Sequence, residues 1–330
     1  MKMTLLRVCV LLLVGIPLAG GYEPPAPTSE IDSCRYDWHD PKRDRDVPVK
    51  LYFPRSASGP RPIVIFSHGL GGSREMYEYL GKHWAGCGYV SVHLQHLGSD
   101  DAVWKNAGAG EGMKAMTKAS LDLRNALNRP PDVSFAIDQL TALNDDSSSP
   151  LKGRLDLDRI AVAGHSFGGY TAMVIAGQAL GPNAITKFAD PRVKCAIEMS
   201  APVPRPAVRD RSYGTVKIPV LHLTGTLDDS PIGDTKAAER RIPFDLMNHA
   251  DTALVTFQGG DHMVFSGRVR EVGGDSKQDA EFQRLICLST TSFLDGFLKG
   301  DGAAQTWVFD GGCKNLLGDH ASFESKRVAR

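Results

Sequence analysis

Short apolar runs recur along the chain, and polar or helix-patterned segments separate them. The runs predict strands at 62–66, 89–94, 160–163, 193–199, 218–223 and 252–257. Apolar residues at helical spacing predict helices at 73–85, 132–143, 167–176 and 279–298. Strands that are apolar along their whole length are buried on both faces, so this alternation predicts an α/β fold. We expect a mostly parallel central sheet with helices on both faces.

The same pattern sets the expected domain organisation. Residues 33–38 and 46–52 predict an N-terminal strand pair joined by a polar turn. The alternation then continues without a linker, so we expect a single domain over residues 22–330, in which the part beyond Gly300 is a tail packed on the body. The segment between the strands at 193–199 and 218–223 is too short for a large cap domain.

The first 21 residues have the pattern of an export signal. Lys2 and Arg7 give a basic start, residues 8–18 are apolar, and small residues precede Tyr22. The apolar run is shorter than the ~20 residues that span a bilayer. We therefore expect a secreted or periplasmic protein with no stable membrane insertion after the signal is removed.

Composition narrows the choice of partners. The chain has 42% hydrophobic residues, enough for a sizeable core, and its 38 basic and 38 acidic side chains give a net charge of +0. A balanced charge leaves no electrostatic footprint for nucleic acid, so we expect no nucleic-acid partner. The sequence makes no prediction of the oligomeric state.

The number and spacing of the cysteines bear on disulfides and on metal binding. Five cysteines follow the expected signal, namely Cys34, Cys87, Cys195, Cys287 and Cys313. An odd number leaves at least one thiol unpaired. Cys287 and Cys313 flank the end of the last long helix and are the expected pair, whereas Cys195 lies in an apolar strand and is expected to be a packed thiol. No Cys-x-x-Cys spacing indicates a zinc or redox site.

One motif points to chemistry. Gly164-His-Ser-Phe-Gly168 follows an apolar run and opens a predicted helix. A Gly-x-Ser-x-Gly turn between a strand and a helix holds its serine in a strained, exposed conformation, so Ser166 is the candidate nucleophile. The alternative is a serine that caps the helix, with structural glycines around it.

A serine nucleophile needs a base and an orienting acid. In this kind of sheet the chain order is serine, acid, histidine. Asp228 follows the predicted strand at 218–223, and His262 follows the one at 252–257. The candidate triad is therefore Ser166, Asp228 and His262, with Asp229 as the nearest alternative acid. The chemistry of such a triad needs no cofactor.

The loop after the strand at 62–66 is expected to complete the oxyanion hole beside Ser166. An oxyanion needs two donors, for which we assign the backbone N–H groups of Phe167 and Leu70. We assign His68 and Trp104 to substrate binding, with packing of its own loop as the alternative for Trp104. The glycine spacing around Leu70 fits no phosphate-binding pattern.

A second cluster of polar residues follows the strand at 89–94. His93, His96, Asp100 and Asp101 are residue types that ligate metals. The spacing is a weak signal, and a hydrogen-bond network within the loop is the alternative. We therefore assign no metal to the candidate site, and whether this cluster binds a metal stays open at this point.

Three motifs carry a resemblance to a known family. The segments 67–72, 95–100 and 164–169 resemble the platelet-activating-factor acetylhydrolase and dienelactone-hydrolase-like branch of the α/β-hydrolases. The stretch 44–54 is similar to the entry into the first strands there. The resemblance covers roughly residues 38–263 and implies an α/β-hydrolase fold with a serine-dependent ester hydrolase activity.

The chain departs from this family at two positions. Dienelactone hydrolases have a cysteine nucleophile where this chain has Ser166, which argues against a lactone substrate. Eukaryotic acetylhydrolases place the acid after the strand that corresponds to 193–199, where this chain has Ser200. The acid is therefore expected from Asp228, and Glu198 is the remaining alternative.

Together these features predict a serine carboxylic ester hydrolase that acts on short-acyl or small esters through an acyl-enzyme. The same triad also fits a secreted polyester hydrolase or lipase-like enzyme, a peptidase or an acyltransferase. A non-catalytic binding protein on this fold is the alternative from another class. The expected partner is an ester substrate, either a small molecule or a polymer.

Overall fold

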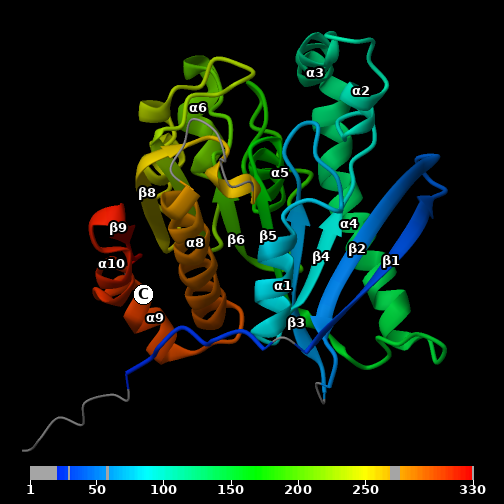
Figure 1. The fold of residues 1–330 in the computed structure, drawn as a ribbon. Coiled ribbons are helices and arrows are strands. Elements are labelled where there is room, and N and C mark those ends of the chain that lie inside the picture. Colours follow the sequence, from blue (N-terminus) through cyan, green and yellow to red (C-terminus); the bar gives the residue numbers. More distant parts are fainter. Residues whose placement is uncertain (1–20, 29, 57–58, 268–275, 329–330) are drawn as a thin grey trace, which may run out of the picture.

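The computed structural model describes residues 21–28, 30–56, 59–267 and 276–328. The predicted export signal, apart from Gly21, lies outside this part of the chain. Within it, nine strands form one sheet in the order β1-β2-β4-β3-β5-β6-β7-β8-β9 (Figure 1). The strands are β1 (Ile31–Asp40), β2 (Arg45–Pro54), β3 (Arg61–Ser67), β4 (Val90–Leu94), β5 (Leu155–His165), β6 (Val193–Met199), β7 (Val220–Leu227), β8 (Thr252–Asp261) and β9 (Ala321–Lys326).

The centre of the sheet is parallel. The run β4-β3-β5-β6-β7-β8 pairs in parallel throughout, and β1, β2 and β9 add antiparallel neighbours at the two edges. Parallel strands all end at the same side of the sheet, so the loops after β3, β5, β7 and β8 meet there. The predicted α/β-hydrolase fold is confirmed.

Helices cover both faces of this sheet (Figure 1). One core holds side chains from α1, α8 and α10, and a second core holds side chains from α4, α5 and α6. The helices are α1 (Glu78–Gly86), α2 (Ala102–Lys105), α3 (Gly112–Leu121), α4 (Leu123–Asp145), α5 (Phe167–Ile175), α6 (Pro206–Tyr213), α7 (Ile242–Leu246), α8 (Ser276–Phe297), α9 (Gly302–Phe309) and α10 (Gly312–Leu317).

Alternation along β5 shows why these strands read as unbroken apolar runs. Ile160 and Val162 belong to the core under α4 and α5, whereas Ala161 and Ala163 belong to the core under α1 and α8. Successive side chains of a strand point to opposite faces, and here both faces are buried. The inner part of the strand, from Ile160 to Ala163, therefore needs apolar residues at every position.

Two helices begin far from their predicted starts. Helix α4 begins at Leu123, nine residues before the predicted start, and contains Pro130 and Pro131. A proline inside a helix lacks an N–H group and crowds the preceding turn, which is why the pair indicated a break. Helix α1 begins only at Glu78, because Tyr77 adopts a left-handed conformation with φ 61°.

The C-terminal tail packs on the body, as predicted, and also extends the sheet. Strand β9 pairs antiparallel with β8 from Thr252 to Phe257. Its burial alternates weakly and its residues are mostly polar, so no apolar run marked it as a strand.

The predicted disulfide is wrong. All five cysteines of the described residues are free thiols. Cys287 lines a groove of α8 together with Tyr79 and His83, whereas Cys313 is buried in α10. Both thiols belong to the core that α1, α8 and α10 share, but no bond joins them. Cys195 is fully buried in β6, as expected of a packed thiol.

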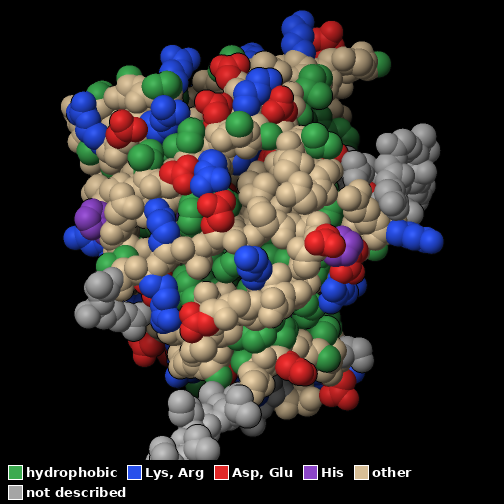
Figure 2. All heavy atoms as spheres, turned by 90° about the vertical axis from the view of Figure 1, so that its left-hand side faces the viewer, with side chains coloured by type: hydrophobic (Ala, Val, Ile, Leu, Met, Phe, Trp, Pro, Cys, Tyr) green, Lys and Arg blue, Asp and Glu red, His purple; other side chains and the backbone are tan. Residues whose placement is uncertain are grey.

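The surface fits the balanced charge of the sequence. On the face in Figure 2, acidic and basic side chains are interspersed, without a large area of one sign. Within the described residues, we find no helix whose length and apolar character would let it cross a bilayer.

Candidate active site

Ser166 stands in a sharp turn between β5 and α5. Its backbone has φ 55° and ψ −118°, a conformation that non-glycine residues rarely adopt. The glycines on either side are required by close backbone contacts. A Cβ at Gly168 would lie 1.8 Å from the carbonyl oxygen of Ser67, and one at Gly164 would lie 2.2 Å from that of Gly168. The backbone of the turn therefore packs directly against the end of β3, with no room for a side chain at either glycine.

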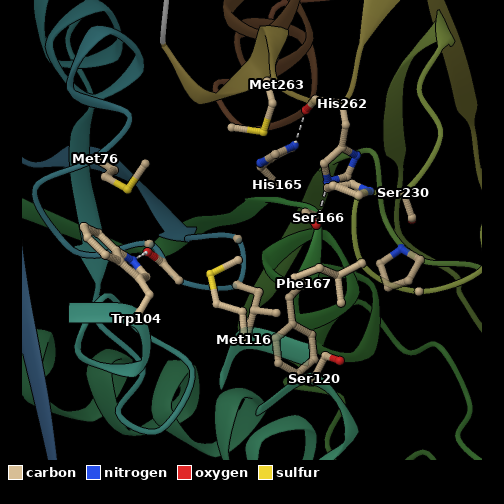
Figure 3. Close-up of a pocket in the computed structure, with 18 of the residues that line it drawn as sticks. Met76, Trp104, Met116, Ser120, His165, Ser166, Phe167, Ser230, His262 and Met263 are labelled. Atoms are coloured by element: carbon tan, nitrogen blue, oxygen red, sulfur yellow. Dashed lines mark hydrogen bonds between the residues drawn. The ribbon is translucent and has the colours of Figure 1, made fainter. Parts of the chain in front are cut away.

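The structure brings Ser166, His262 and Asp228 together. The hydroxyl of Ser166 lies 2.9 Å from Nε2 of His262 (Figure 3). On the other side of the ring, Nδ1 of His262 lies 2.7 Å from Oδ1 of Asp228. Asp228 follows β7 and is fully buried, and His262 follows β8 and is 6% exposed. In this arrangement Nδ1–H donates to the carboxylate, which leaves Nε2 free to accept the serine proton.

Further donors hold the carboxylate of Asp228. Its Oδ2 accepts from the hydroxyl of Ser200 at 2.5 Å and from that of Thr224 at 2.7 Å. Burial alone would raise the pKa of Asp228, but the hydrogen bond from His262 and the charge of Arg240 outweigh burial and lower it. The acid is therefore ionised at neutral pH, as the stabiliser of an imidazolium must be.

The alternative acids have other partners. Asp229 is exposed, forms an ion pair with Lys236 at 2.9 Å and accepts from the backbone of Ala237. Glu198 is buried and bonds Nδ1 of His222 at 2.7 Å and the backbone N–H of Ala201. Neither carboxylate contacts His262 within the described residues.

The two assigned oxyanion donors lie on either side of Ser166. Phe167 is the first residue of α5, so its N–H has no partner one turn earlier. In the facing loop, the N–H of Gly69 bonds the Tyr77 hydroxyl and that of Gly71 bonds the carbonyl of Ser99. The N–H of Leu70 between them donates to no group in the described part of the chain. Both Leu70 and Phe167 line the same pocket as Ser166.

A buried arginine of α4 contacts both of these segments. Arg129 is fully buried, and it donates to the carbonyl of His68 at 2.6 Å and to the hydroxyl of Ser99 at 3.0 Å. Its guanidinium also lies over the ring of Phe167, 4.2 Å from the centroid. Arg129 therefore fixes the loop before Leu70 relative to the first residue of α5.

A second contact of serine, histidine and aspartate lies beneath this loop. The Ser67 hydroxyl is 2.8 Å from Nε2 of His96, and Nδ1 of His96 is 2.9 Å from Asp132. All three side chains are fully buried, and Arg43 and Arg45 also bind Asp132. No substrate can reach this serine, so the cluster supports the loop.

The polar residues in and after β4 that were candidates for a metal site each form hydrogen bonds with other groups. His93 bonds the carbonyl of Met76 and the hydroxyl of Ser91, and Asp100 accepts from Gln95 at 2.8 Å. His96 contacts Ser67 and Asp132, as described above. Within the described residues, no group of three or more histidine, cysteine or acidic side chains is arranged to hold a metal.

A pocket of about 530 Å³ opens over Ser166. Its walls are mostly apolar, with Met76, Met116 and Met263 around the serine (Figure 3). Trp104 lines the pocket, is 42% exposed and donates its indole N–H to the carbonyl of Gly71 at 2.8 Å. The segment that carries it is not loop throughout, because it contains α2 and α3.

His68 is not placed where a substrate would contact it. Its side chain is 1% exposed and is not among the residues that line the pocket. One ring nitrogen lies 2.6 Å from the carbonyl of Gly69, and the other accepts from the backbone of His96. The expected contact between His68 and substrate is therefore not supported, and the side chain shapes the loop instead.

His165 supports the base from behind. Its Nε2 lies 2.9 Å from the carbonyl of His262, and its Nδ1 lies 2.9 Å from the hydroxyl of Tyr77. Burial, together with the nearby His262, holds the pKa of His165 well below its usual range. His165 is thus a neutral hydrogen-bonding residue.

Sequence reasoning missed Arg240, Arg129 and Thr224. Arg240 is 2% exposed and contacts both the acid and the base of the triad. Nothing in the sequence distinguishes it from the adjacent Arg241, which is exposed and pairs with Asp245. Thr224 is the sole one of the three with a local signal, since it directly follows the predicted strand at 218–223 and precedes Asp228 by four residues.

Two protein families match different parts of the chain. The PET hydrolase-like family matches residues 104–276, which include all three triad positions. The family of platelet-activating factor acetylhydrolase, isoform II, matches residues 44–125, which include the loop with Leu70.

Curated relatives agree with these matches. The platelet-activating factor acetylhydrolase of Cavia porcellus is 26% identical over 304 residues, 82% of this chain and 66% of that protein. That of Canis lupus familiaris is 31% identical over 248 residues, 67% of this chain and 51% of that protein. The chain thus spans between about half and two thirds of the length of these relatives.

Proposed function

Because the chain belongs to the PET hydrolase-like family and to the platelet-activating-factor-acetylhydrolase-like branch of the α/β-hydrolases, we propose that it is a serine carboxylic ester hydrolase. The observation that carries the proposal is the hydrogen-bonded chain from Ser166 through His262 to Asp228 at the floor of an apolar pocket. Its acid is buried and ionised, and its serine is exposed to the pocket.

The proposed reaction has two halves. In the first, Oγ of Ser166 attacks the ester carbonyl while Nε2 of His262 takes its proton, and the N–H groups of Phe167 and Leu70 hold the oxyanion. The imidazolium, stabilised by Asp228, then gives this proton to the leaving alcohol. In the second half, water attacks the acyl-enzyme with His262 again as base and releases the acid.

The pocket favours a neutral, small ester. Its volume of about 530 Å³ suits a small-molecule ligand. Among the described residues that line it there is no aspartate or glutamate to pair with a cationic group, and the lining Arg240 is already paired with Asp228. These features support short-acyl or small neutral esters, and the serine nucleophile argues for open-chain esters over lactones.

An extended polyester is the second candidate, favoured by the apolar surface beside the pocket. Trp104, Met113 and Leu121 are 42%, 59% and 77% exposed, and Trp104 and Leu121 also line the pocket. A polymer chain that enters the pocket could lie over these side chains. The match to the PET hydrolase-like family supports the same substrate class.

Export is part of the proposal. The basic start, the apolar run at 8–18 and the small residues before Tyr22 support a cleaved signal and a secreted or periplasmic enzyme. We further propose that residues 22–330 form a single catalytic domain.

The test is hydrolysis of p-nitrophenyl esters from acetate to palmitate, and of a polyester film, by the wild type and two variants. Ser166→Ala should lose at least about 10³-fold in kcat on every substrate that the wild type accepts. Ser120→Ala is the matched control, because Ser120 also lines the pocket but bonds only the carbonyl of Thr117. Preference for acetate supports the small-ester enzyme, and release of products from the film supports the polyester hydrolase. A wild type inert on all these substrates, or a fully active Ser166→Ala variant, would refute the proposal.

A further inference from the structure

Arg240 occupies a buried position between the ends of β6 and β7. Its Nη1 donates to the carbonyls of Ser200 at 2.9 Å and Ala201 at 2.7 Å, directly after β6. Its Nε donates to the carbonyl of Asp228 at 3.2 Å, and its Nη2 bonds the hydroxyl of Ser230 at 2.8 Å. A planar guanidinium can hold all these groups at once, which the single ammonium of a lysine cannot do.

The same Nη2 reaches the acid and the base of the triad. It lies 3.3 Å from Oδ1 of Asp228 and 3.3 Å from Nδ1 of His262. Because the Nδ1–H of His262 donates a hydrogen bond to Asp228, this N–H and an N–H of Arg240 Nη2 both point at the same oxygen, Oδ1 of Asp228. Protonation of His262 then places a second positive charge beside the guanidinium, which disfavours the imidazolium.

Other ionisable groups face this arginine. They are Asp228 and Asp229 after β7, Tyr213 of α6, His165 of β5 and His262 after β8. Glu198 of β6 is one step removed, since it accepts from the N–H of Ala201, whose carbonyl accepts from Arg240. Asp229 pairs with Lys236, and Glu198 bonds His222. Among the described residues, Asp228 is therefore the buried carboxylate that offsets the charge of Arg240, and the resting pair is electrically neutral.

We propose that Arg240 is a positioning residue of the triad, which fixes Asp228 at the end of β7 and keeps His262 unprotonated to lower pH than Asp228 alone would allow. This inference rests on the proposed function of the same site. Arg240 touches no reacting atom and acts through Asp228 and His262. It therefore has two separable effects, one from its bond geometry and one from its charge.

Two substitutions separate these effects. Arg240→Met removes the charge and the hydrogen bonds, whereas Arg240→Lys keeps the charge and loses most of the bonds. Arg241→Met is the matched control, since Arg241 is exposed and its ion pairs in the described part of the chain are with Asp245 and Glu324. For each variant, kcat and KM for p-nitrophenyl acetate are measured from about pH 5 to about pH 9, and circular dichroism checks that the variant is folded.

We expect Arg240→Met to lower kcat by about 10-fold with KM within about threefold, because the acid is no longer held in place. The acidic limb of kcat/KM should move to higher pH by about one unit. Arg240→Lys should also lose kcat but keep the acidic limb of the wild type. A folded Arg240→Met variant with the wild-type limb and kcat would overturn the inference. If Arg240→Met does not fold, an Arg240→Lys variant with unchanged kcat would overturn it.

A readout that needs no ester turnover separates this inference from the proposed function. The ring signals of His262 in nitrogen-correlated NMR spectra report when the imidazole takes up a proton. The midpoint of this change should lie about one pH unit higher in Arg240→Met than in the wild type. An inert wild type that still shows the shift would refute the esterase and leave the role of Arg240 intact. An active esterase without the shift would refute only the role of Arg240.

Discussion

Replacement of Asp228 by asparagine should test the charge of the triad almost independently of its geometry. An amide has one acceptor and one donor side. The Oδ1 position faces two obligatory donors, the ring N–H of His262 and the guanidinium of Arg240, so the amide oxygen belongs there. The amide nitrogen then meets the hydroxyls of Ser200 and Thr224, which can accept as well as donate. The imidazole therefore keeps the tautomer that accepts from Ser166.

What asparagine removes is the negative charge beside the imidazolium. The Nδ1–Oδ1 distance is 2.7 Å, and the centres of the two spread charges lie about 4 Å apart. With an effective dielectric constant of about 20, Coulomb's law gives about 4 kcal/mol. Since about 1.4 kcal/mol corresponds to a factor of ten, kcat should fall by about 10³-fold. The uncompensated guanidinium of Arg240 acts in the same direction.

The assay is kcat for p-nitrophenyl acetate at about pH 8, with thermal melting to verify the fold. Asp229→Asn is the control, because Asp229 is exposed and pairs with Lys236. The kcat of this variant should stay within about twofold of the wild type. A folded Asp228→Asn variant that loses less than about tenfold would show that another group stabilises the imidazolium. A loss equal to that of Asp229→Asn would remove Asp228 from the triad altogether.

Two further predictions concern stability. Gly168→Ala should lower the free energy of unfolding by about 3 kcal/mol or more, because its Cβ would meet the Ser67 carbonyl at 1.8 Å. Gly214→Ala is the control, because its Cβ would meet open space, and its free energy of unfolding should stay within about 0.5 kcal/mol of the wild type. Both values are measured by urea titration. Equal midpoints for the two variants would contradict the close packing around Gly168. Burial lowers the pKa of His93 to about 3 and that of His96 to about 4. In the unfolded chain both histidines have ordinary pKa values near 6.5, so below about pH 6.5 the unfolded chain binds more protons than the folded chain does. The melting temperature should therefore fall as pH decreases from about 6.5 to about 4, and a constant value over this range would show that the two rings are not buried as neutral groups.

The positions of the triad residues follow from rules that a sequence reveals. Apolar runs locate the strands, and in a parallel sheet every loop after a strand reaches the same edge. Once Ser166 was placed after β5, the order of the chain pointed to Asp228 and His262. Arg240 follows from no such rule, because its contacts come from backbone carbonyls of other loops. Its neighbour Arg241 has the same local sequence and faces solvent.

The long-range features that were missed share one cause. The tail strand β9 is held by its pairing with β8, and its own residues show no apolar run. Helix α4 continues through Pro130 and Pro131, where local preference indicates a break, and Pro130 is buried in the fold. The predicted Cys287–Cys313 disulfide is wrong for the same reason. Two cysteines near the end of one helix in the sequence need not have thiols that point toward each other. Tertiary packing decides each of these cases.

The chain holds two contacts of serine, histidine and aspartate, and their comparison shows what makes one of them a site. Ser67 and Ser166 lie 2.8 Å and 2.9 Å from their histidines, so hydrogen-bond geometry does not distinguish them. Ser67 ends a strand and is fully buried, whereas Ser166 stands in a strained turn, is partly exposed and lines a pocket. The first of these networks anchors the loop that carries Leu70. The second has a partly exposed nucleophile that opens into a pocket, which a network with only a structural role does not require.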